Sequence, residues 1–196
     1  MTKIFFVRHA QPDHSWEDDR TRPLTGDGKR DRLVALECLK DKNIDAFYSS
    51  PYKRSYETIL PVAEFYKMKI TKDERLRERK CGVTSGGASG NVKEMFRKRW
   101  ADFSFCEEGG ESIGAVQKRN IEALKEILEK ENGKNICIGT HGTALSSIIN
   151  YYKSEFCVQD FLRIVDWMPY IVELDFDGMT FVSLKEIGHV YKEFKK

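Results

Sequence analysis

Short apolar runs alternate with amphipathic segments along this chain, and this alternation limits the folds that it can adopt. Buried strands are expected over residues 3–8, 46–48 and 135–140, and each is followed, directly or after a loop, by apolar residues at helical spacing. Strand–helix units of this kind are typical of a sheet whose faces are covered by helices. The sequence therefore predicts an α/β fold with a single, mostly parallel sheet flanked by helices on both faces.

Local signals give the approximate ends of the other elements. Thr25 is the expected N-cap of a first helix, and Ser50, followed by Pro51 at the first helical position, is the expected start of another. Asp177-Gly178 indicates a hairpin turn between the last two strands. In chain order, the expected helices are 26–41, 51–67, 92–103, 112–131 and 143–153, and the expected further strands lie near 69–71, 171–176 and 179–184.

Residues 76–110 break the alternation of strands and helices. We expect one domain over residues 1–196, with this segment as a helical insertion over the active-site edge of the sheet. Within it, 82–90 is rich in glycine and serine and should be mobile. The helix after it carries four basic residues, which could form a substrate lid. A solvated helix face is favoured instead, because charges on amphipathic helices are routine. These basic residues are Lys93, Arg97, Lys98 and Arg99.

Charge and composition exclude several classes of partner. The chain has 33 Lys and Arg against 31 Asp and Glu, so it has no electrostatic footprint for nucleic acid. No apolar run approaches the roughly 20 residues of a membrane span, and the apolar start is too short for a signal peptide, which predicts a cytoplasmic protein without membrane contact. Five cysteines without a CxxC pair argue against a disulfide framework or a zinc ribbon. The oligomeric state stays open.

Two histidines stand where apolar strands end. His9 follows the strand over 3–8, and His141 follows the strand over 135–140. In an open α/β sheet, ligands bind outside the carboxyl ends of the strands, so both side chains are expected in one crevice. Arg54 lies one turn into the helix after a third strand, and helical side chains lean back toward the N-terminus of their helix. Its guanidinium is therefore expected at the same edge.

Arg8, His9, Arg54 and His141 together describe a pocket for a dianionic phosphate. Arginine offers fixed, paired donors that fit phosphate oxygens, and a helix starting after Gly142 would add backbone N–H groups and the positive end of its dipole. Each residue alone also has a structural interpretation, as a hydrogen-bonded histidine or a surface arginine. Since the sequence has no aspartate cluster or HxxxH spacing suited to a divalent ion, we expect no metal and no cofactor.

Six short motifs extend these four residues over nearly the whole chain. They are Val7-Arg8-His9-Ala10, Leu24-Thr25-x-x-Gly28, Ser49-Ser50-Pro51-x-x-Arg54-x-x-x-Thr58, Leu76-x-Glu78-x-x-x-Gly82, Gly109-Gly110-Glu111-Ser112 and Thr140-His141-Gly142. In this order the motifs resemble the histidine phosphatase superfamily, in its phosphoglycerate mutase-like branch. One motif alone would be weak evidence, whereas six in order are strong.

The resemblance implies a role for each matching residue. His9 corresponds to the nucleophile that becomes phosphorylated, and Glu78 corresponds to the proton donor. The residues themselves do not decide between His9 and His141 as nucleophile, nor do they separate Glu78 from the charged residues around it. The further candidates for phosphate or substrate binding are Arg8, Arg54, His141, Gly142, Ser15 and Thr25.

Departures from the mutase pattern favour a hydrolase. The mutases commonly carry asparagine where Ser15 stands, and Gly82 is not followed by their usual Trp-x-Gly stretch. Three hypotheses stay open: a phosphatase for a small phosphorylated metabolite or a phosphoprotein, a phosphoglycerate-type phosphomutase, and a non-catalytic phosphate-binding module. Substrate selectivity is expected to lie in the loop 11–24 and the insertion. The sequence does not decide which loop residues contact the substrate; the candidates are Gln11, His14, Ser15, Arg20 and Arg22.

Overall fold

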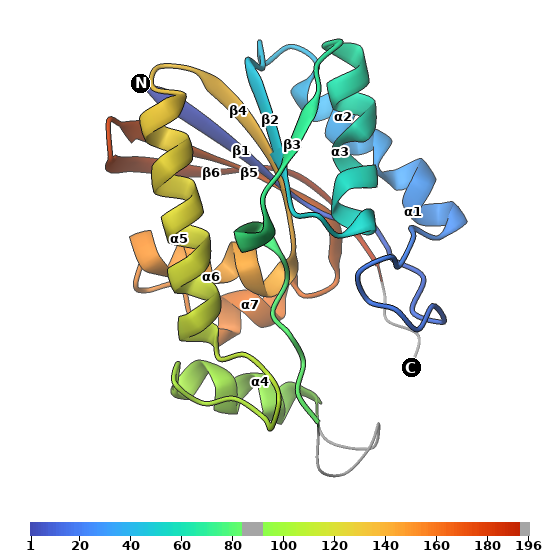
Figure 1. Ribbon diagram of the computed structural model, residues 1–196, viewed down its shortest axis with the longest axis vertical. Coiled ribbons are helices and arrows are strands. Elements are labelled where there is room, and N and C mark those ends of the chain that lie inside the picture. Colours follow the sequence, from blue (N-terminus) through green and yellow to red (C-terminus); the bar gives the residue numbers. More distant parts are fainter. Residues whose placement is uncertain (84–91, 193–196) are drawn as a thin grey trace.

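Six strands pair into one sheet in the computed structural model of the protein, which describes residues 1–83 and 92–192. The strands are β1 (Thr2–Arg8), β2 (Ala46–Ser49), β3 (Ile70–Lys72), β4 (Asn135–Thr140), β5 (Trp167–Asp177) and β6 (Thr180–Tyr191). They lie in the order β3-β2-β4-β1-β5-β6, and the first four are parallel to one another (Figure 1). β5 runs antiparallel to both of its neighbours. The prediction of a mostly parallel sheet is confirmed.

Helices cover both faces of this sheet. They are α1 (Gly26–Asp31), α2 (Leu33–Leu39), α3 (Lys53–Phe65), the short 3-10 helix η1 (Glu74–Leu76), α4 (Val92–Ala101), α5 (Ile113–Lys130), α6 (Gly142–Tyr152) and α7 (Val158–Ile164). Because side chains alternate along a strand, β1 sends Ile4 and Phe6 into a core with α5, α6 and α7. Its Phe5 and Val7 enter a second core with α2 and α3. The expected layers are therefore present.

The strand register aligns the ends that carry the candidate site. Arg8 of β1 is paired with Thr140 of β4, and Ser49 of β2 is paired with Gly139. The hydrogen bonds continue one residue further, since the His9 N–H donates to the Thr140 carbonyl at 3.1 Å. The residues that follow β1, β2 and β4 therefore meet at one edge.

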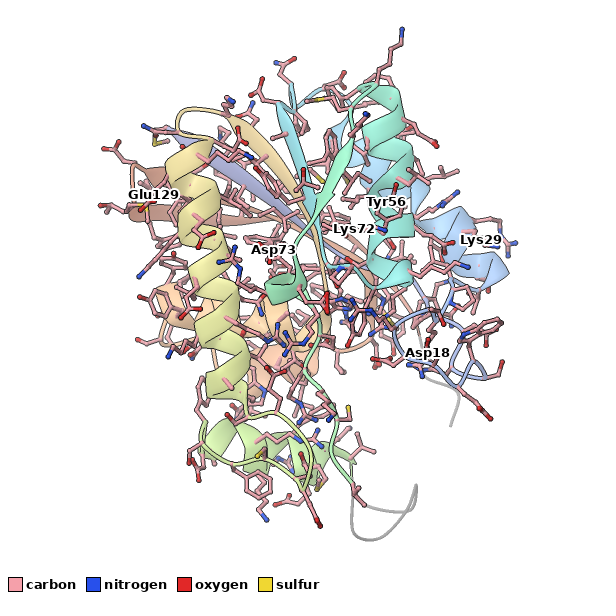
Figure 2. The ribbon with its side chains drawn as sticks, viewed as in Figure 1. Asp18, Lys29, Tyr56, Lys72, Asp73 and Glu129 are labelled. Carbon is pink, nitrogen blue, oxygen red and sulfur yellow. The ribbon has the colours of Figure 1, made fainter. Side chains whose placement is uncertain are left out.

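The short strand β3 is joined to α3 by the Lys72 ammonium, which lies 4.5 Å from the centre of the Tyr56 ring (Figure 2).

Several element boundaries differ from the predictions. Thr25 caps a helix as expected, but the helix over 26–41 is divided at Arg32, where a bond from the Ala35 N–H to the Arg32 carbonyl tightens the backbone. Ser50 does not cap α3, which begins after Tyr52, because the Ser50 hydroxyl accepts the Tyr52 N–H in a turn that precedes the helix. The helix α7 was not predicted, since its apolar residues Phe161 and Ile164 span less than two turns.

The insertion contributes α4 to a separate aromatic cluster. Phe96, Trp100 and Phe103 pack with Phe161 of α7, whereas Val92 at the start of α4 is 58% exposed. Figure 1 shows α4 at the lower end of the molecule, past the sheet. Most of the glycine-rich stretch lies outside the described residues, which exclude 84–91. Among the described residues, no helix has the length and apolar character to cross a bilayer.

Candidate active site

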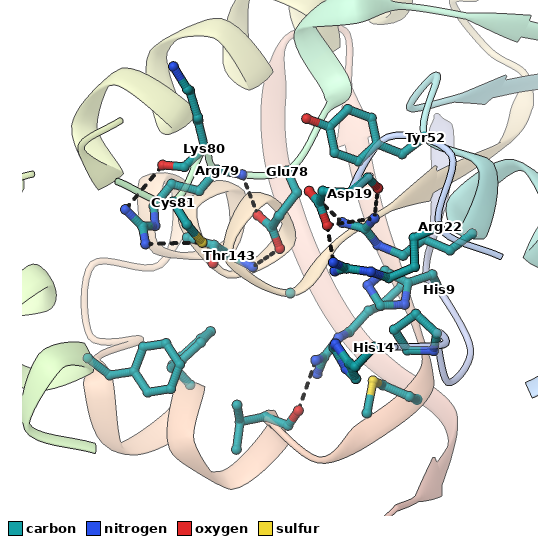
Figure 3. A pocket seen from close by; sticks show the side chains of 18 of the residues that line it. His9, His14, Asp19, Arg22, Tyr52, Glu78, Arg79, Lys80, Cys81 and Thr143 are labelled. Carbon is teal, nitrogen blue, oxygen red and sulfur yellow. Dashed lines mark hydrogen bonds and ion pairs between the residues drawn. The ribbon is translucent and has the colours of Figure 1, made fainter. Parts of the chain in front are cut away.

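A cavity of about 560 Å³ opens at the carboxyl edge of the sheet (Figure 3). It collects residues from the end of β1, the loop after it, the start of α3, the insertion, and the start of α6. The candidates that line it are Arg8, His9, Arg54, Glu78 and Gly142. Its other walls are formed by Pro12, His14, Asp19, Arg22, Tyr52, Arg79, Lys80, Cys81, Phe96, Arg99, Thr143, Phe161, Val165 and Met168. Five of the predicted site residues therefore meet in one place.

His9 is nearly buried and has one ring nitrogen engaged by the backbone. Its Nδ1 lies 2.8 Å from the carbonyl oxygen of Ala10. A carbonyl can only accept, so Nδ1 carries the hydrogen and Nε2 carries the lone pair. Burial lowers the pKa of His9 well below its ordinary value, and the charges of Arg54 and Arg8 lower it further. The ring is therefore a neutral imidazole near pH 7, with Nε2 as a potential nucleophile.

The turn after His9 is held by α3. The Ala10 N–H donates to the Thr58 hydroxyl at 2.9 Å, and that hydroxyl in turn donates to the Arg54 carbonyl at 2.7 Å. Both contacts are buried. These bonds give a physical reason for the threonine in the Arg54-x-x-x-Thr58 motif, because it ties the arginine-bearing helix to the histidine turn.

Arg8 is fixed by the end of α7. Its terminal nitrogens donate to the carbonyls of Ile164 and Val165 at 2.7 and 2.8 Å, which leaves Nε buried with no partner among the described residues. Burial lowers the pKa of Arg8 to about 10, so the side chain stays charged at neutral pH. A Cβ on Gly142 would lie 3.2 Å from the Arg8 Cζ, so the small residue after His141 makes room for this guanidinium.

Arg54 is also buried, and its guanidinium is bound by Asp19 of the loop 11–24. Its guanidinium donates to the Asp19 carbonyl at 2.5 Å and lies 3.1 Å from the Asp19 carboxylate. That carboxylate also pairs with Arg22 at 2.7 Å, as Figure 3 shows. The Arg54 guanidinium lies 5.0 Å from the centre of the Tyr52 ring. An incoming phosphate must therefore compete with Asp19 for this arginine.

Glu78 lies against the N-terminus of α6. Its carboxylate accepts the N–H groups of Thr143 at 3.0 Å, Ala144 at 3.2 Å and Arg79 at 2.7 Å. These donors and the positive end of the helix dipole hold the carboxylate at the pocket wall. The expectation that α6 offers its N–H groups to phosphate is therefore only partly met, because two of them already bind Glu78.

The backbone before Glu78 is fixed by Arg119 of α5. This side chain donates to the carbonyls of Arg75 and Arg77 at 2.7 Å each, and to the Glu78 carbonyl at 3.1 Å. It also pairs with the Glu111 carboxylate at 2.7 Å. Glu111 belongs to the Gly109-Gly110-Glu111-Ser112 motif, so this motif helps to hold the irregular segment after η1 that carries Glu78.

Three predicted site residues do not line the pocket. His141 is fully buried behind His9, with the two ring centres 5.3 Å apart. Ser15 lies in the exposed loop and donates to the Asp13 carboxylate at 2.6 Å. Thr25 caps α1, and its hydroxyl accepts the Gly28 N–H. Of the undecided loop residues, only His14 and Arg22 line the cavity, while Arg20 pairs with Glu74 outside it.

Several residues that line the cavity were not predicted from the sequence. Arg79 and Arg99 are joined by the buried carboxylate of Glu107, at 3.2 and 2.7 Å. Arg99 is the one member of the basic run on α4 that reaches the pocket, whereas Lys93, Arg97 and Lys98 are exposed as expected for a solvated face. Asp19 and Tyr52 were also missed. No spacing rule could have indicated them, since a loop and a helix start are brought together only by folding.

A metal site is not evident in the part of the chain that the structure describes. Residues 1–83 and 92–192 contain no group of three or more His, Cys, Asp or Glu side chains placed to hold an ion. The carboxylates at the pocket, Glu78 and Asp19, are engaged by backbone amides and by arginines. The expectation of metal independence stays a prediction.

Comparison with known proteins identifies the family. Residues 4–184 match the model of the histidine phosphatase superfamily, branch 1, and the chain belongs to this superfamily. The resemblance stated from the six motifs is thereby confirmed.

Named relatives include both hydrolases and mutases. Phosphoserine phosphatase 1 of Hydrogenobacter thermophilus is 29% identical over 150 residues, which are 72% of this chain and 71% of that protein. The probable phosphoglycerate mutase GpmB of Serratia proteamaculans is 26% identical over 163 residues, 76% of this chain and 74% of that protein. The structure of Bacillus stearothermophilus YhfR shares the fold, with a TM-score of 0.76 at 24% identity over 93% of this chain and 95% of that one.

Proposed function

We propose that this protein is a phosphatase that hydrolyses phosphate monoesters through a phosphohistidine intermediate on His9. The observation that carries this proposal is the hydrogen bond from His9 Nδ1 to the Ala10 carbonyl, in a pocket that also holds Arg8, Arg54 and Glu78. It supports a neutral imidazole with its lone pair on Nε2, which is the form that can attack phosphorus.

In the first step, Nε2 of His9 forms a bond to phosphorus while the bond from phosphorus to the ester oxygen breaks. The charge on the transferring phosphoryl group is stabilised by Arg8, Arg54 and His141. Glu78 donates a proton to the departing oxygen as general acid, so it must be protonated at that moment.

In the second step, water attacks the phosphohistidine. Glu78, now a carboxylate, takes a proton from that water, and the phosphoryl group leaves Nε2 as inorganic phosphate. The half-buried position of Glu78 at the cavity wall supports its access to both the leaving group and the water. Its amide partners keep the group in place through the cycle.

A phosphomutase is the second candidate, because relatives of both kinds match the chain. It would return the phosphoryl group to a product instead of to water. The loop after His9 favours the phosphatase, since Ser15, at the position of the mutase asparagine, bonds Asp13 and is not among the residues that line the cavity. A non-catalytic binding module is disfavoured by the His9, Arg8, Arg54 and Glu78 set. A cytoplasmic location and a small metabolite or phosphoprotein substrate remain predictions.

Phosphorylated metabolites, 3-phosphoglycerate and phosphoserine among them, are expected to release inorganic phosphate when they are incubated with the purified protein. Release from the best substrate should exceed any formation of 2-phosphoglycerate, with or without a bisphosphoglycerate primer. The measurement combines a phosphate-release screen with product analysis by NMR. Formation of 2-phosphoglycerate much faster than phosphate would replace the phosphatase with the mutase.

Activity is expected to survive exhaustive chelation, because arginines supply the positive charge that a divalent ion would otherwise bring. Vanadate should inhibit, since it can adopt the five-coordinate geometry of the transition state. The measurement is the turnover rate before and after EDTA treatment, with vanadate titrated against the chelated protein. Loss of turnover with EDTA and recovery with magnesium or zinc would contradict the expectation.

A further inference from the structure

Ser50 and His141 form a buried pair behind the catalytic pocket. The Ser50 Oγ lies 2.7 Å from Nε2 of His141, and both residues are fully buried. The His141 ring contacts His9 on one side and Tyr52 on the other, each at 5.3 Å between ring centres. Burial lowers the pKa of His141 well below its ordinary value, with a further contribution from the charge of Arg54. The ring is therefore neutral and carries a single N–H.

The direction of the hydrogen bond between Ser50 and His141 follows from what else the hydroxyl contacts. Its oxygen already accepts the Tyr52 N–H at 3.2 Å. The other group at hydrogen-bond distance is Nε2 of His141. If Nε2 also donated to the oxygen, neither of these two contacts would use the hydroxyl hydrogen. When Ser50 donates to Nε2, all the hydrogen-bonding groups of the hydroxyl are used. The hydrogen of the imidazole then lies on Nδ1.

Nδ1 of His141 is buried and has no partner among residues 1–83 and 92–192. A buried donor without an acceptor is costly, so such a group in a native fold calls for an acceptor that arrives with a ligand. The neighbouring His9 and Gly142 both line the phosphate cavity. A phosphoryl group offers only acceptor oxygens to this donor, so the Nδ1–H tautomer is the productive one.

We infer that Ser50 is a positioning residue for catalysis: it holds His141 in the tautomer whose Nδ1–H donates to the phosphoryl oxygen. The inference rests on the proposed phosphatase function and goes beyond it, because it assigns a role to a residue that does not touch the substrate. It also explains why Ser50 does not cap α3, since its hydroxyl is engaged by His141 and by the turn.

The neighbouring Ser49 provides a matched control. It is equally buried, and its hydroxyl donates to the Ser50 carbonyl at 2.8 Å and lies 3.3 Å from the Ser55 hydroxyl. Ser49→Ala thus removes the same hydroxyl one residue away without touching the His141 ring. A difference between Ser50→Ala and Ser49→Ala therefore reports on the two contacts of the Ser50 hydroxyl, with His141 and with the Tyr52 N–H, and the state of the His141 ring separates the first from the second.

The test uses the whole chain with ¹⁵N-labelled histidine, and long-range ¹H–¹⁵N spectra that distinguish a protonated from an unprotonated ring nitrogen. In the wild type, Nδ1 of His141 should be protonated and should shift when inorganic phosphate is added. Ser50→Ala should populate the other tautomer and weaken phosphate binding by about 10-fold to 100-fold, the range for one hydrogen bond to a charged group. Ser49→Ala should keep the wild-type tautomer and affinity.

Two results would overturn the inference. One is an unprotonated Nδ1 in the wild-type protein, which the spectrum shows even if Ser50→Ala fails to fold. The other is a phosphate affinity for Ser50→Ala equal to that for Ser49→Ala. Neither measurement needs turnover. If the protein gave the expected spectra and phosphate binding but released no phosphate from esters, the proposed function would be contradicted and the inference about Ser50 would stand.

Discussion

His9→Ala is expected to lower the rate of phosphate release by roughly 10⁴-fold to 10⁶-fold, the scale seen when a covalent nucleophile is removed. Without Nε2, the nucleophile of the proposed first step is missing, and Arg8 and Arg54 can only bind the phosphoryl group. The measurement is steady-state turnover of an alkyl phosphate, together with trapping of labelled phosphate on the wild-type protein without acid, since phosphohistidine is acid-labile. Label should be found on His9 and should be absent from the variant.

His189→Ala serves as the matched control. His189 lies on β6, exposed and stacked on Trp167 at 3.7 Å between ring centres, and it does not line the cavity. It should keep nearly full activity, and both variants should retain the wild-type circular dichroism spectrum. Turnover above about 1% of wild type by folded His9→Ala would reject His9 as the nucleophile.

Glu78→Gln should slow the phosphorylation of His9 about 10²-fold to 10⁴-fold when the substrate is an alkyl phosphate. The slowing should be much smaller when the substrate is a nitrophenyl phosphate. An alkyl phosphate expels a strongly basic alkoxide, which needs a proton in the transition state, whereas nitrophenolate leaves without one. Single-turnover kinetics isolate this step, because in the proposed mechanism the same carboxylate activates water in the second step. Equal slowing of both substrates would mean that Glu78 positions the substrate without donating a proton.

Glu78→Gln also disturbs the hydrogen bonds of the side chain, so its effect must be compared between two substrates. A glutamine amide keeps one acceptor, but its NH₂ group cannot accept a backbone N–H, so Glu78→Gln loses part of the hold on Thr143, Ala144 and Arg79. This disturbance affects both substrates alike and cancels in the ratio of their rates. Glu74→Gln is the control, since Glu74 is exposed and pairs with Arg20 outside the pocket. Glu107 is unsuitable because it joins Arg79 and Arg99 in the pocket wall.

The candidate site divides into a part that was predicted from sequence and a part that was not. The strand ends at His9 and His141 were predictable, because a strand that stops at a polar residue is a local pattern and the carboxyl ends of parallel strands share an edge. The loop was not. Ser15 was expected to bind substrate, yet the folded loop brings Asp19 to Arg54 instead, with Arg22 paired to the same Asp19 carboxylate. Loop direction depends on contacts with distant elements, such as the Arg20–Glu74 pair, which have no sequence period.

By itself, the sequence determined the α/β class, the order of the strands, most of the helices between them, and the family. These properties follow from apolar periodicity and from short motifs, in which each residue acts within its own turn or strand. Only the tertiary structure decided which groups are already engaged: Glu78 by the amides of α6, Arg54 by Asp19, and Nε2 of His141 by Ser50. Those contacts join residues that lie 35 to 91 positions apart in the chain. The chemistry of the pocket therefore depends on side chains whose proximity exists only after the sheet has formed.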